Sequence, residues 1–210
     1  MPFNKDSRPF MVLFLVAASV LVASALTALY AYTKPVIDEQ KARLFNRRVI
    51  EVFGLADPGA ELQPARVDEL YSKHVKQDQA GGLTIYRGYD DAGKELGVAF
   101  EASGSGLWSV IRVLVALTPD FKNIYRLRVL EQGETPGLGG RIAEPEFLQK
   151  FDDLPLGPAP GYVGVVAYQA PDKPYEVAAI TGATQTSKSL EKLLNEGIAA
   201  FLAAVKGVTP

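Results

Sequence analysis

The residues best suited to chemistry in this chain lie in one short turn, Thr181-Gly182-Ala183-Thr184-Gln185-Thr186-Ser187. The turn follows an apolar run at 175–180 and precedes a helical pattern that begins near Ser187. The first turn of a helix has unpaired N–H groups and a partial positive charge, which favour an anion. Several hydroxyls share this turn, and Lys188 adds a cation. The pattern is typical of a phosphate site, although a Ser/Thr-rich helix cap without a ligand has the same residue types.

The composition excludes several other kinds of site. The chain of 210 residues contains no cysteine, which excludes disulfides, thiolate metal sites and a cysteine nucleophile. His74 is the only histidine, which excludes multi-histidine metal sites and argues against a Ser-His-Asp hydrolase. A hydrophobic content of 48% and a net charge of -2 argue against disorder and against a nucleic-acid partner. We therefore expect no metal, and any redox chemistry must come from an organic cofactor.

The N-terminal part of the chain predicts a single membrane span. After a short segment at 1–9, residues 10–32 carry no charge, and as a helix they would cross a hydrocarbon core of about 30 Å. Tyr30 and Tyr32 lie where an interfacial aromatic belt is expected. A cleaved signal peptide, with its site at 23–25, is the alternative. The apolar run continues past that site, so we favour a retained anchor.

The flanking charges leave the orientation of this span open. More basic residues follow the span than precede it, which favours a cytoplasmic C-terminal side, but large domains can translocate regardless of charge. Pro35 marks the predicted exit from the membrane. Residues 33–55 have the spacing of an amphipathic helix, and residues 56–80 predict a loop with one short helix, so 33–80 forms a linker.

Residues 81–210 predict one domain with a mainly antiparallel sheet and flanking helices, which makes the fold class α+β. Apolar residues alternate in several short runs, and the arginines of the fourth run are expected on its wet face. The predicted strands are 83–89, 95–102, 110–117, 124–130, 161–168 and 175–180. A short helix is expected at 145–151, a proline-rich connector at 152–160, and a closing helix with one apolar stripe at 187–206.

A second unusual segment is Gly133-Glu134-Thr135-Pro136-Gly137-Leu138-Gly139-Gly140. Its glycines and proline exclude regular structure and predict a sharp turn or a close approach of the backbone. An ordinary glycine-rich connection would look similar. Glu134 and Thr135, however, add polar groups that a simple turn does not require.

These two segments, together with Gly106-Leu107-Trp108-Ser109, resemble the FMN-binding subunit of two ion-translocating redox complexes. The two are the sodium-translocating NADH:quinone oxidoreductase, through its C subunit, and the Rnf electron-transport complex, through its G subunit. The resemblance covers the whole layout of one span, a linker and a flavin domain. It implies an electron-carrier subunit of an ion-translocating oxidoreductase, without independent turnover, that relays electrons one at a time.

The resemblance also implies the flavin site and the location of the domain. Thr184 would carry FMN through a phosphoester, placed there by a separate flavin transferase. The chain would be a single-pass protein of the bacterial inner membrane, with its flavin domain on the periplasmic side and with the other subunits of the complex as partners. No residue of this chain is expected to be catalytic. The predicted cofactor-binding residues are Thr184, Thr181, Gly182, Ala183, Thr186, Ser187, Lys188, Glu134, Thr135, Pro136, Gly137, Leu138, Leu107 and Trp108.

The residues themselves support these roles. The phosphodiester would lie against the helix N-terminus and its hydroxyls. Leu107, Trp108 and Leu138 would cover the isoalloxazine ring, and Thr135 with the loop backbone would bind its polar edge. A charged Glu134 near the ring would disfavour added negative charge on reduction.

The sequence departs from the family pattern at one position. Ala178 stands three residues before Thr181, where the family usually has an acidic residue, and Glu176 is the nearest acid. Two alternatives therefore stay open beside the electron carrier. One is a membrane-anchored assembly module with an empty or loosely filled flavin site. The other is a stand-alone anchored flavoprotein reductase. The sequence does not distinguish the two complexes, the coupling ion, or the donor and acceptor.

Overall fold

The computed structural model describes residues 8–206, so the predicted segment 1–9 lies mostly outside the described residues, as do the last four residues of the predicted domain. The chain divides into two compact units, one that ends at Arg43 and one that begins at Leu44. Helix α1 (Arg8–Val52) runs through this boundary without interruption.

The predicted apolar helix is confirmed, and it continues without a break through most of the amphipathic helix predicted at residues 33–55. Pro35 lies inside α1 and does not break it. A proline removes one donor and disfavours a helix interior, yet single prolines persist in long apolar helices. The hydroxyl of Thr33 donates to the carbonyl of Leu29 at 3.0 Å. By length and composition, α1 is the one helix within residues 8–206 that could cross a membrane.

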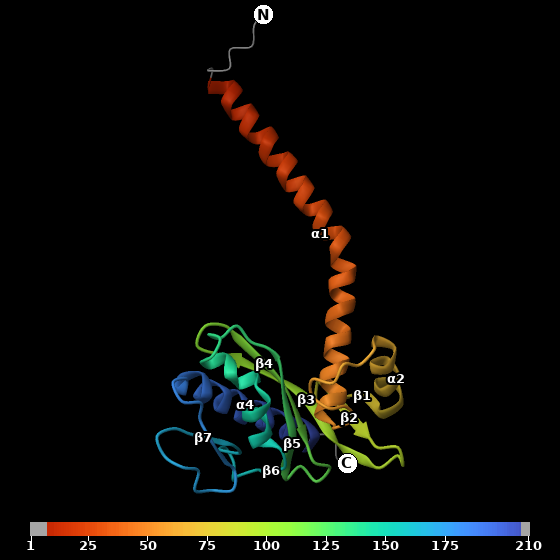
Figure 1. Ribbon diagram of the computed structural model, residues 1–210, viewed down its shortest axis with the longest axis vertical. Helices are drawn as coiled ribbons and strands as arrows, with labels where there is room; N and C mark the ends of the chain where they lie inside the picture. Colours follow the sequence, from red (N-terminus) through yellow and green to blue (C-terminus); the bar gives the residue numbers. More distant parts are fainter. Residues whose placement is uncertain (1–7, 207–210) are drawn as a thin grey trace, which may run out of the picture. The chain divides into compact units, whose positions relative to one another are not determined.

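The second unit has the predicted α+β architecture, built on a six-stranded antiparallel meander in the order β1-β2-β3-β4-β5-β6 (Figure 1). Its strands are β1 (Val75–Ala80), β2 (Leu83–Tyr89), β3 (Glu95–Ser105), β4 (Val110–Leu117), β5 (Asn123–Glu131) and β6 (Leu154–Pro155). The four strands predicted between residues 83 and 130 are confirmed, with β3 three residues longer than expected.

Strand β1 corrects the prediction of a loop at residues 75–80. Its sequence, Val-Lys-Gln-Asp-Gln-Ala, buries only its two end residues and pairs only with β2 at the sheet edge. Pairing there depends on backbone hydrogen bonds, so no apolar alternation marks the strand. The short helix expected in the linker is confirmed as α2 (Pro64–His74), which begins with a proline at a position that tolerates it.

The last two predicted strands are much shorter than expected and do not join the main sheet. They form a separate parallel pair, β7 (Gly164–Val166) and β8 (Glu176–Ala178). The segment before them contains the 3-10 helix η1 (Gly139–Ala143), α3 (Pro145–Leu148) and the 3-10 helix η2 (Gln149–Phe151). The chain closes with α4 (Thr184–Lys206), which begins three residues earlier than predicted.

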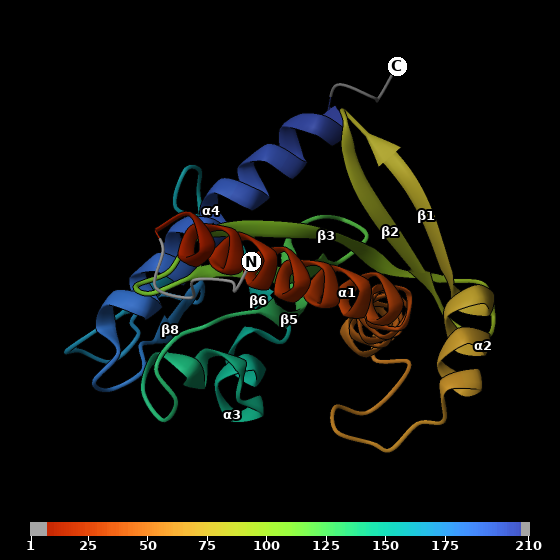
Figure 2. The same cartoon turned by 90° about the horizontal axis from the view of Figure 1, so that it is seen from above.

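Two apolar cores cover the two faces of the main sheet. On one face, α4 packs along β3 (Figure 2). Phe100 and Phe201 stack there with ring centroids 4.5 Å apart. On the other face, the last turns of α1 and helix α2 cover side chains such as Leu114 and Ala116. Because the sheet is covered on both faces, β4 is buried on both sides for most of its length.

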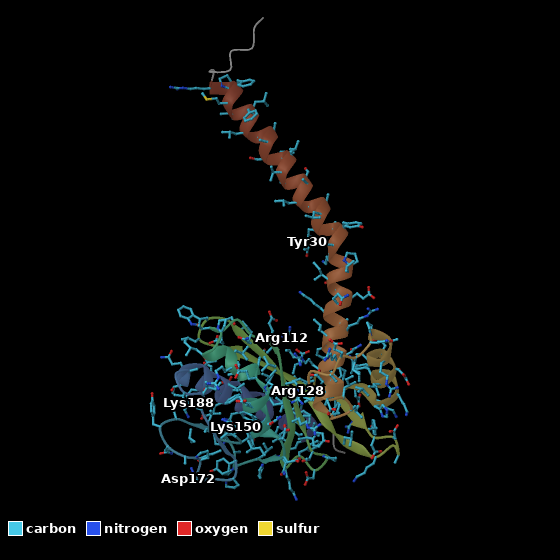
Figure 3. The ribbon with its side chains drawn as sticks, in the orientation of Figure 1. Tyr30, Arg112, Arg128, Lys150, Asp172 and Lys188 are labelled. Atoms are coloured by element: carbon cyan, nitrogen blue, oxygen red, sulfur yellow. The ribbon has the colours of Figure 1, made fainter. Side chains whose placement is uncertain are left out.

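The prediction that the arginines of β5 lie on a wet face is wrong for Arg128. This side chain is only 5% exposed, because the last turns of α1 cover that face of the sheet. Its Nη2 donates to the carbonyl of Glu51 at 3.4 Å, and its Nε lies 3.9 Å from the Glu51 carboxylate. Figure 3 shows Arg128 in the middle of the domain. The alternation of side chains along the strand predicted which residues share this face of the sheet, but it did not predict that α1 covers the face.

Candidate functional site

The structure brings together the three segments that the sequence singled out, and the carboxylate of Glu134 joins them. Oε1 of Glu134 accepts hydrogen bonds from the backbone N–H groups of Trp108 at 3.0 Å and Ser109 at 3.3 Å. Oε2 accepts from the hydroxyl of Thr186 at 2.7 Å. The segment 106–109 immediately before β4, the loop 133–140 and the first turn of α4 therefore meet at one buried side chain.

Two glycines make this close approach feasible. A Cβ atom on Gly106 would lie 2.5 Å from Oε1 of Glu134, and a Cβ atom on Gly139 would lie 2.5 Å from Oγ1 of Thr186. Both distances are shorter than real Cβ contacts, so a larger residue would push the segments apart. Gly139, one of the loop glycines predicted to allow a close approach or a sharp turn of the backbone, has the first of these roles beside Glu134, whereas this role of Gly106 was not predicted.

The environment of Glu134 keeps it ionised. Burial raises the pKa of its carboxyl, but hydrogen bonds from the N–H of Trp108, the hydroxyl of Thr186 and the N–H groups of Ser109 and Leu107 outweigh burial, so the pKa lies below its ordinary value. Within residues 8–206, no lysine, arginine or histidine forms an ion pair with Glu134. The site thus contains a buried negative charge that only neutral donors stabilise.

The hydroxyls of the Thr181–Ser187 turn fall into two groups. Thr186 and Ser187 are buried and used within the protein: Thr186 binds Glu134, and Oγ of Ser187 accepts from the N–H of Ile180 at 3.1 Å. Thr181 is exposed and Thr184, the first residue of α4, is half-buried. Of the four hydroxyls, those of Thr181 and Thr184 are therefore the ones left to meet a ligand.

Two further predicted residues, Ala183 and Lys188, differ in how far they are buried. The side chain of Ala183 is buried, and its N–H donates to the carbonyl of Ile180 at 3.0 Å, which fixes the turn before the helix. Lys188 is exposed and donates to Glu191 at 2.7 Å (Figure 3). An anion at Thr184 would lie at the helix N-terminus, whose first N–H groups the helix itself leaves unpaired.

The loop 133–140 has an exposed tip. The carbonyl of Thr135 accepts from the N–H of Leu138 at 3.1 Å and from that of Gly140 at 3.0 Å. Pro136 and Gly137 form the exposed turn, and Gly137 has a φ of +73°. The tip is therefore a compact turn that presents Leu138.

Leu138 and two other apolar side chains are exposed around the site. Leu138 is 46% exposed, Leu107 49% and Trp108 73%. Leu138 lies against Gly182, whose φ is +80° and whose Cβ position would be 3.3 Å from Leu138 Cδ2. Exposed large apolar groups beside a polar turn are what a flat aromatic ligand would cover.

Cavities lie on both sides of residues 179–181. The larger, about 510 Å³, is lined by Val166, Ala167, Tyr168, Gln169, Ala170, Ala178, Ala179, Ile180, Thr181, Gly182 and Thr184. The smaller, about 160 Å³, is lined by Arg141, Glu144, Glu146, Phe147, Lys150, Ala179, Ile180 and Thr181. Thr184 lines only the larger cavity, whose size falls within the range of small-molecule sites.

The sequence did not predict the contribution of residues 166–170 to this site. The predicted strand includes Tyr168, but β7 ends at Val166 and the following loop lines the larger cavity. No motif marks this loop, so no signal in the sequence could have identified it. Ala178 also lines this cavity, whereas the carboxylate of Glu176 pairs with Lys173 at 3.2 Å and accepts from the N–H of Asp172. Glu176 does not replace an acid at position 178.

Comparison with known proteins agrees with this geometry. The FMN-binding domain family matches residues 106–199, a range that contains all three segments. The chain is 27% identical to the C subunit of the Na(+)-translocating NADH-quinone reductase of Neisseria meningitidis, over 90% of this chain and 89% of that protein. It is also 27% identical to the G subunit of the ion-translocating oxidoreductase complex of Methanosarcina acetivorans, over 88% of this chain and 89% of that protein.

Solved structures show the same fold. The crystal structure of Shewanella oneidensis NqrC superimposes with a TM-score of 0.67 at 21% identity, covering 76% of this chain and 93% of that chain. The C subunit of the Na(+)-translocating NADH-quinone reductase from Parabacteroides distasonis gives a TM-score of 0.66 at 17% identity, covering 83% and 96%. The chain is thus similar to the FMN-binding domain family over residues 106–199, and to these subunits over most of its length.

Proposed function

We propose that this chain is the FMN-carrying, single-span subunit of a membrane redox complex that translocates ions, with FMN attached to Thr184 through a phosphoester. The observation that carries the proposal is the position of Thr184. It is the first residue of α4, half-buried, and it lines a cavity of about 510 Å³. Its hydroxyl thus lies where a phosphate would meet the N-terminus of a helix.

The residues present fit FMN. Thr184 would hold the phosphate by its ester oxygen, and the first N–H groups of α4 would stabilise the remaining negative charge. Leu107, Trp108 and Leu138 offer exposed apolar surface for the ring, and Gly182 leaves the approach to Thr184 open. FMN supplies the ability to accept and donate electrons one at a time.

Glu134 has two roles in this proposal. Its hydrogen bonds fix the segment that presents Leu107 and Trp108 relative to the first turn of α4. Its uncompensated charge would also disfavour additional negative charge nearby. Because its pKa is lowered, it remains a carboxylate at neutral pH and does not deliver a proton.

The assignment of this chain to a membrane redox complex rests on its relatives. They belong to a Na(+)-translocating NADH-quinone reductase and to an ion-translocating oxidoreductase complex, and this chain covers most of their length. We infer that α1 anchors the chain, that the flavin domain lies on the outer side, and that a flavin transferase attaches FMN. No charge lies within residues 10–32, so the ion path belongs to other subunits.

The decisive experiment is in-gel flavin fluorescence. The full chain is coexpressed with a flavin transferase and run on a denaturing gel beside Thr184→Val and the control Thr181→Val, which removes the neighbouring exposed hydroxyl. We expect fluorescent bands for the wild type and the control, and a dark band for Thr184→Val. Fluorescence in Thr184→Val would contradict attachment at that residue.

A dark wild-type band would favour the assembly module with an empty or loosely filled site. The observation behind that second candidate is Ala178, which brings no carboxylate to the cavity beside Thr184. Copurification of multi-span subunits with the tagged chain would distinguish a member of a complex from a stand-alone reductase. A member of a complex brings its partners, and a stand-alone reductase is purified alone.

The side of the membrane can be tested with a single cysteine, because the chain has none of its own. Lys122 is highly exposed in the turn between β4 and β5. Lys122→Cys should react with a membrane-impermeant thiol reagent in intact cells whose outer membrane has been permeabilised. Reaction only after lysis of the inner membrane would contradict the outer location.

A further inference from the structure

Tyr168 has an unusual environment in the segment that links β7 to β8. Its side chain is 97% exposed, so its ring gains nothing from burial. Its backbone φ is +66°, in the left-handed region that a bulky residue rarely adopts. An exposed aromatic residue in a strained conformation does not contribute to the core, and such outliers concentrate at ligand sites.

The position of Tyr168 indicates which ligand it would meet. Tyr168 lines the larger cavity together with Thr181, Gly182 and Thr184, while β7 and β8 contribute Val166 and Ala178 to its wall. A phosphate ester at Thr184 would place the rest of its ligand beside this cavity. The only aromatic side chain that lines it within the described residues is Tyr168.

Leu138 lies on another side of the same turn. It contacts Gly182 but does not line the cavity. The Thr181–Thr184 turn is therefore bordered by an aliphatic side chain from the loop 133–140 and by an aromatic side chain from the loop after β7. A flat ring held at Thr184 can be covered from both loops.

We propose that Tyr168 stacks on the isoalloxazine ring of the flavin held at Thr184, on the face away from Leu138. This inference rests on the proposed function and deepens it by naming a flavin-contacting residue. An electron-rich phenol ring stacks favourably on the electron-poor flavin, and stacking orders the loop that carries it. The ring then shields one face of the flavin from water.

The test uses flavin fluorescence, because a tyrosine stacked on a flavin quenches its emission by electron transfer. All proteins are full-length, carry FMN and contain Trp108→Phe, which removes the only tryptophan. The emission before and after denaturation is compared for this background, for Tyr168→Leu and for Tyr168→Trp. Tyr89→Leu, at the end of β2, is the matched control.

We expect strong native quenching in the background and in the Tyr89→Leu control. Tyr168→Leu should lose it, and Tyr168→Trp should restore it. In chain made without the transferase, Tyr168→Leu should weaken the binding of free FMN by about fivefold, the usual effect of one aromatic stack.

Two results would count against the proposal, and the denaturing gel separates them. Unchanged native quenching in Tyr168→Leu, with a fluorescent band on the gel, would overturn the role of Tyr168 and leave the proposed function intact. A chain that is dark on the gel and binds no free FMN would overturn the proposed function and, with it, this inference.

Discussion

Two buried glutamates join the parts of the domain, and they are stabilised in opposite ways. Glu51, 1% exposed at the end of α1, accepts hydrogen bonds from Arg47 at 2.9 Å and Arg48 at 2.7 Å, with Arg128 at 3.9 Å. Glu134, 4% exposed, accepts only from neutral groups in the part of the chain that the structure describes. The first charge is neutralised within its cluster, and the second is not.

This difference separates a structural carboxylate from one that acts on its surroundings. A neutralised pair has a weak field beyond its own contacts, whereas an uncompensated charge in a poorly solvated site acts over several ångströms. Glu51 fixes the end of α1 to the sheet. Glu134 fixes the segments 106–109 and 133–140 to the first turn of α4 and also gives this region a negative potential.

The polar groups around Glu51 are also less completely hydrogen-bonded than those around Glu134. Among residues 8–206, neither Nε of Arg128 nor Oδ1 of Asp152, whose charge acts on Arg128, has a hydrogen-bond partner, although both atoms are buried. Burial lowers the pKa of Arg128 and raises the pKa of Asp152, so both charged forms are disfavoured there. Such a cluster adds little net stability while complete, but its disruption is costly.

The largest effect is expected from Glu51→Ala. Removal of this carboxylate deprives Arg47 and Arg48 of an acceptor. It also removes one of the two acidic charges that act on buried Arg128, the other being Asp152, and should lower the free energy of unfolding by about 3–5 kcal/mol. Thermal unfolding of the full chain in detergent measures the loss. The control is Glu39→Ala. Glu39 also pairs with an arginine four residues away in α1, Arg43, but it is exposed, so its removal should lower the free energy of unfolding by less than about 1 kcal/mol. Equal losses would remove the distinction between the two pairs.

Glu134→Ala should have the next largest effect. It leaves the N–H groups of Trp108 and Ser109 and the hydroxyl of Thr186 without their acceptor, at a cost of about 3 kcal/mol. Glu134→Gln keeps the shape and an oxygen acceptor, so it should cost about half as much. The same unfolding assay compares them, and a glutamine variant as unstable as the alanine variant would show that the charge, not the hydrogen bonds, stabilises the loops.

The pH dependence of stability should reveal the charge of Glu134. Its pKa in the folded protein lies below the ordinary value of 4.5. Its stabilising contribution is therefore complete above about pH 4.5 and is lost as the pH falls through the folded pKa. The stability difference between the wild type and Glu134→Gln should shrink on acidification below pH 4.5. A difference that stays constant from pH 7 to pH 3 would contradict a lowered pKa.

The smallest effect concerns the potential of bound flavin. Removal of the Glu134 charge should make reduction easier and raise the potential by an amount on the order of tens of millivolts, because less negative charge then opposes the added electron. Spectroelectrochemical titration of Glu134→Gln tests this. Glu131→Gln is the control, as Glu131 is exposed and paired with Arg112. No shift, or an equal shift in both variants, would argue that Glu134 is purely structural.

Several features of this protein followed from its sequence because local physics determines them. Alternation of apolar residues identified β2 to β5, since the side-chain period of a strand matches a sheet with a buried face. The uncharged run at 10–32 indicated the long apolar helix, and glycine and hydroxyl residues marked the loop 133–140 and the turn before α4.

Other features depended on contacts between distant segments. Glu134 and Thr186 lie 52 residues apart, and their hydrogen bond, which decides that neither points freely at a ligand, exists only once the loop and α4 pack together. The burial of Arg128 required the end of α1 to cover β5, which no strand pattern contains. Tyr168 reached the cavity only because β7 ended early. Short-range patterns thus determined which elements form, while long-range packing decided which polar groups were used internally and which remained for the proposed flavin site.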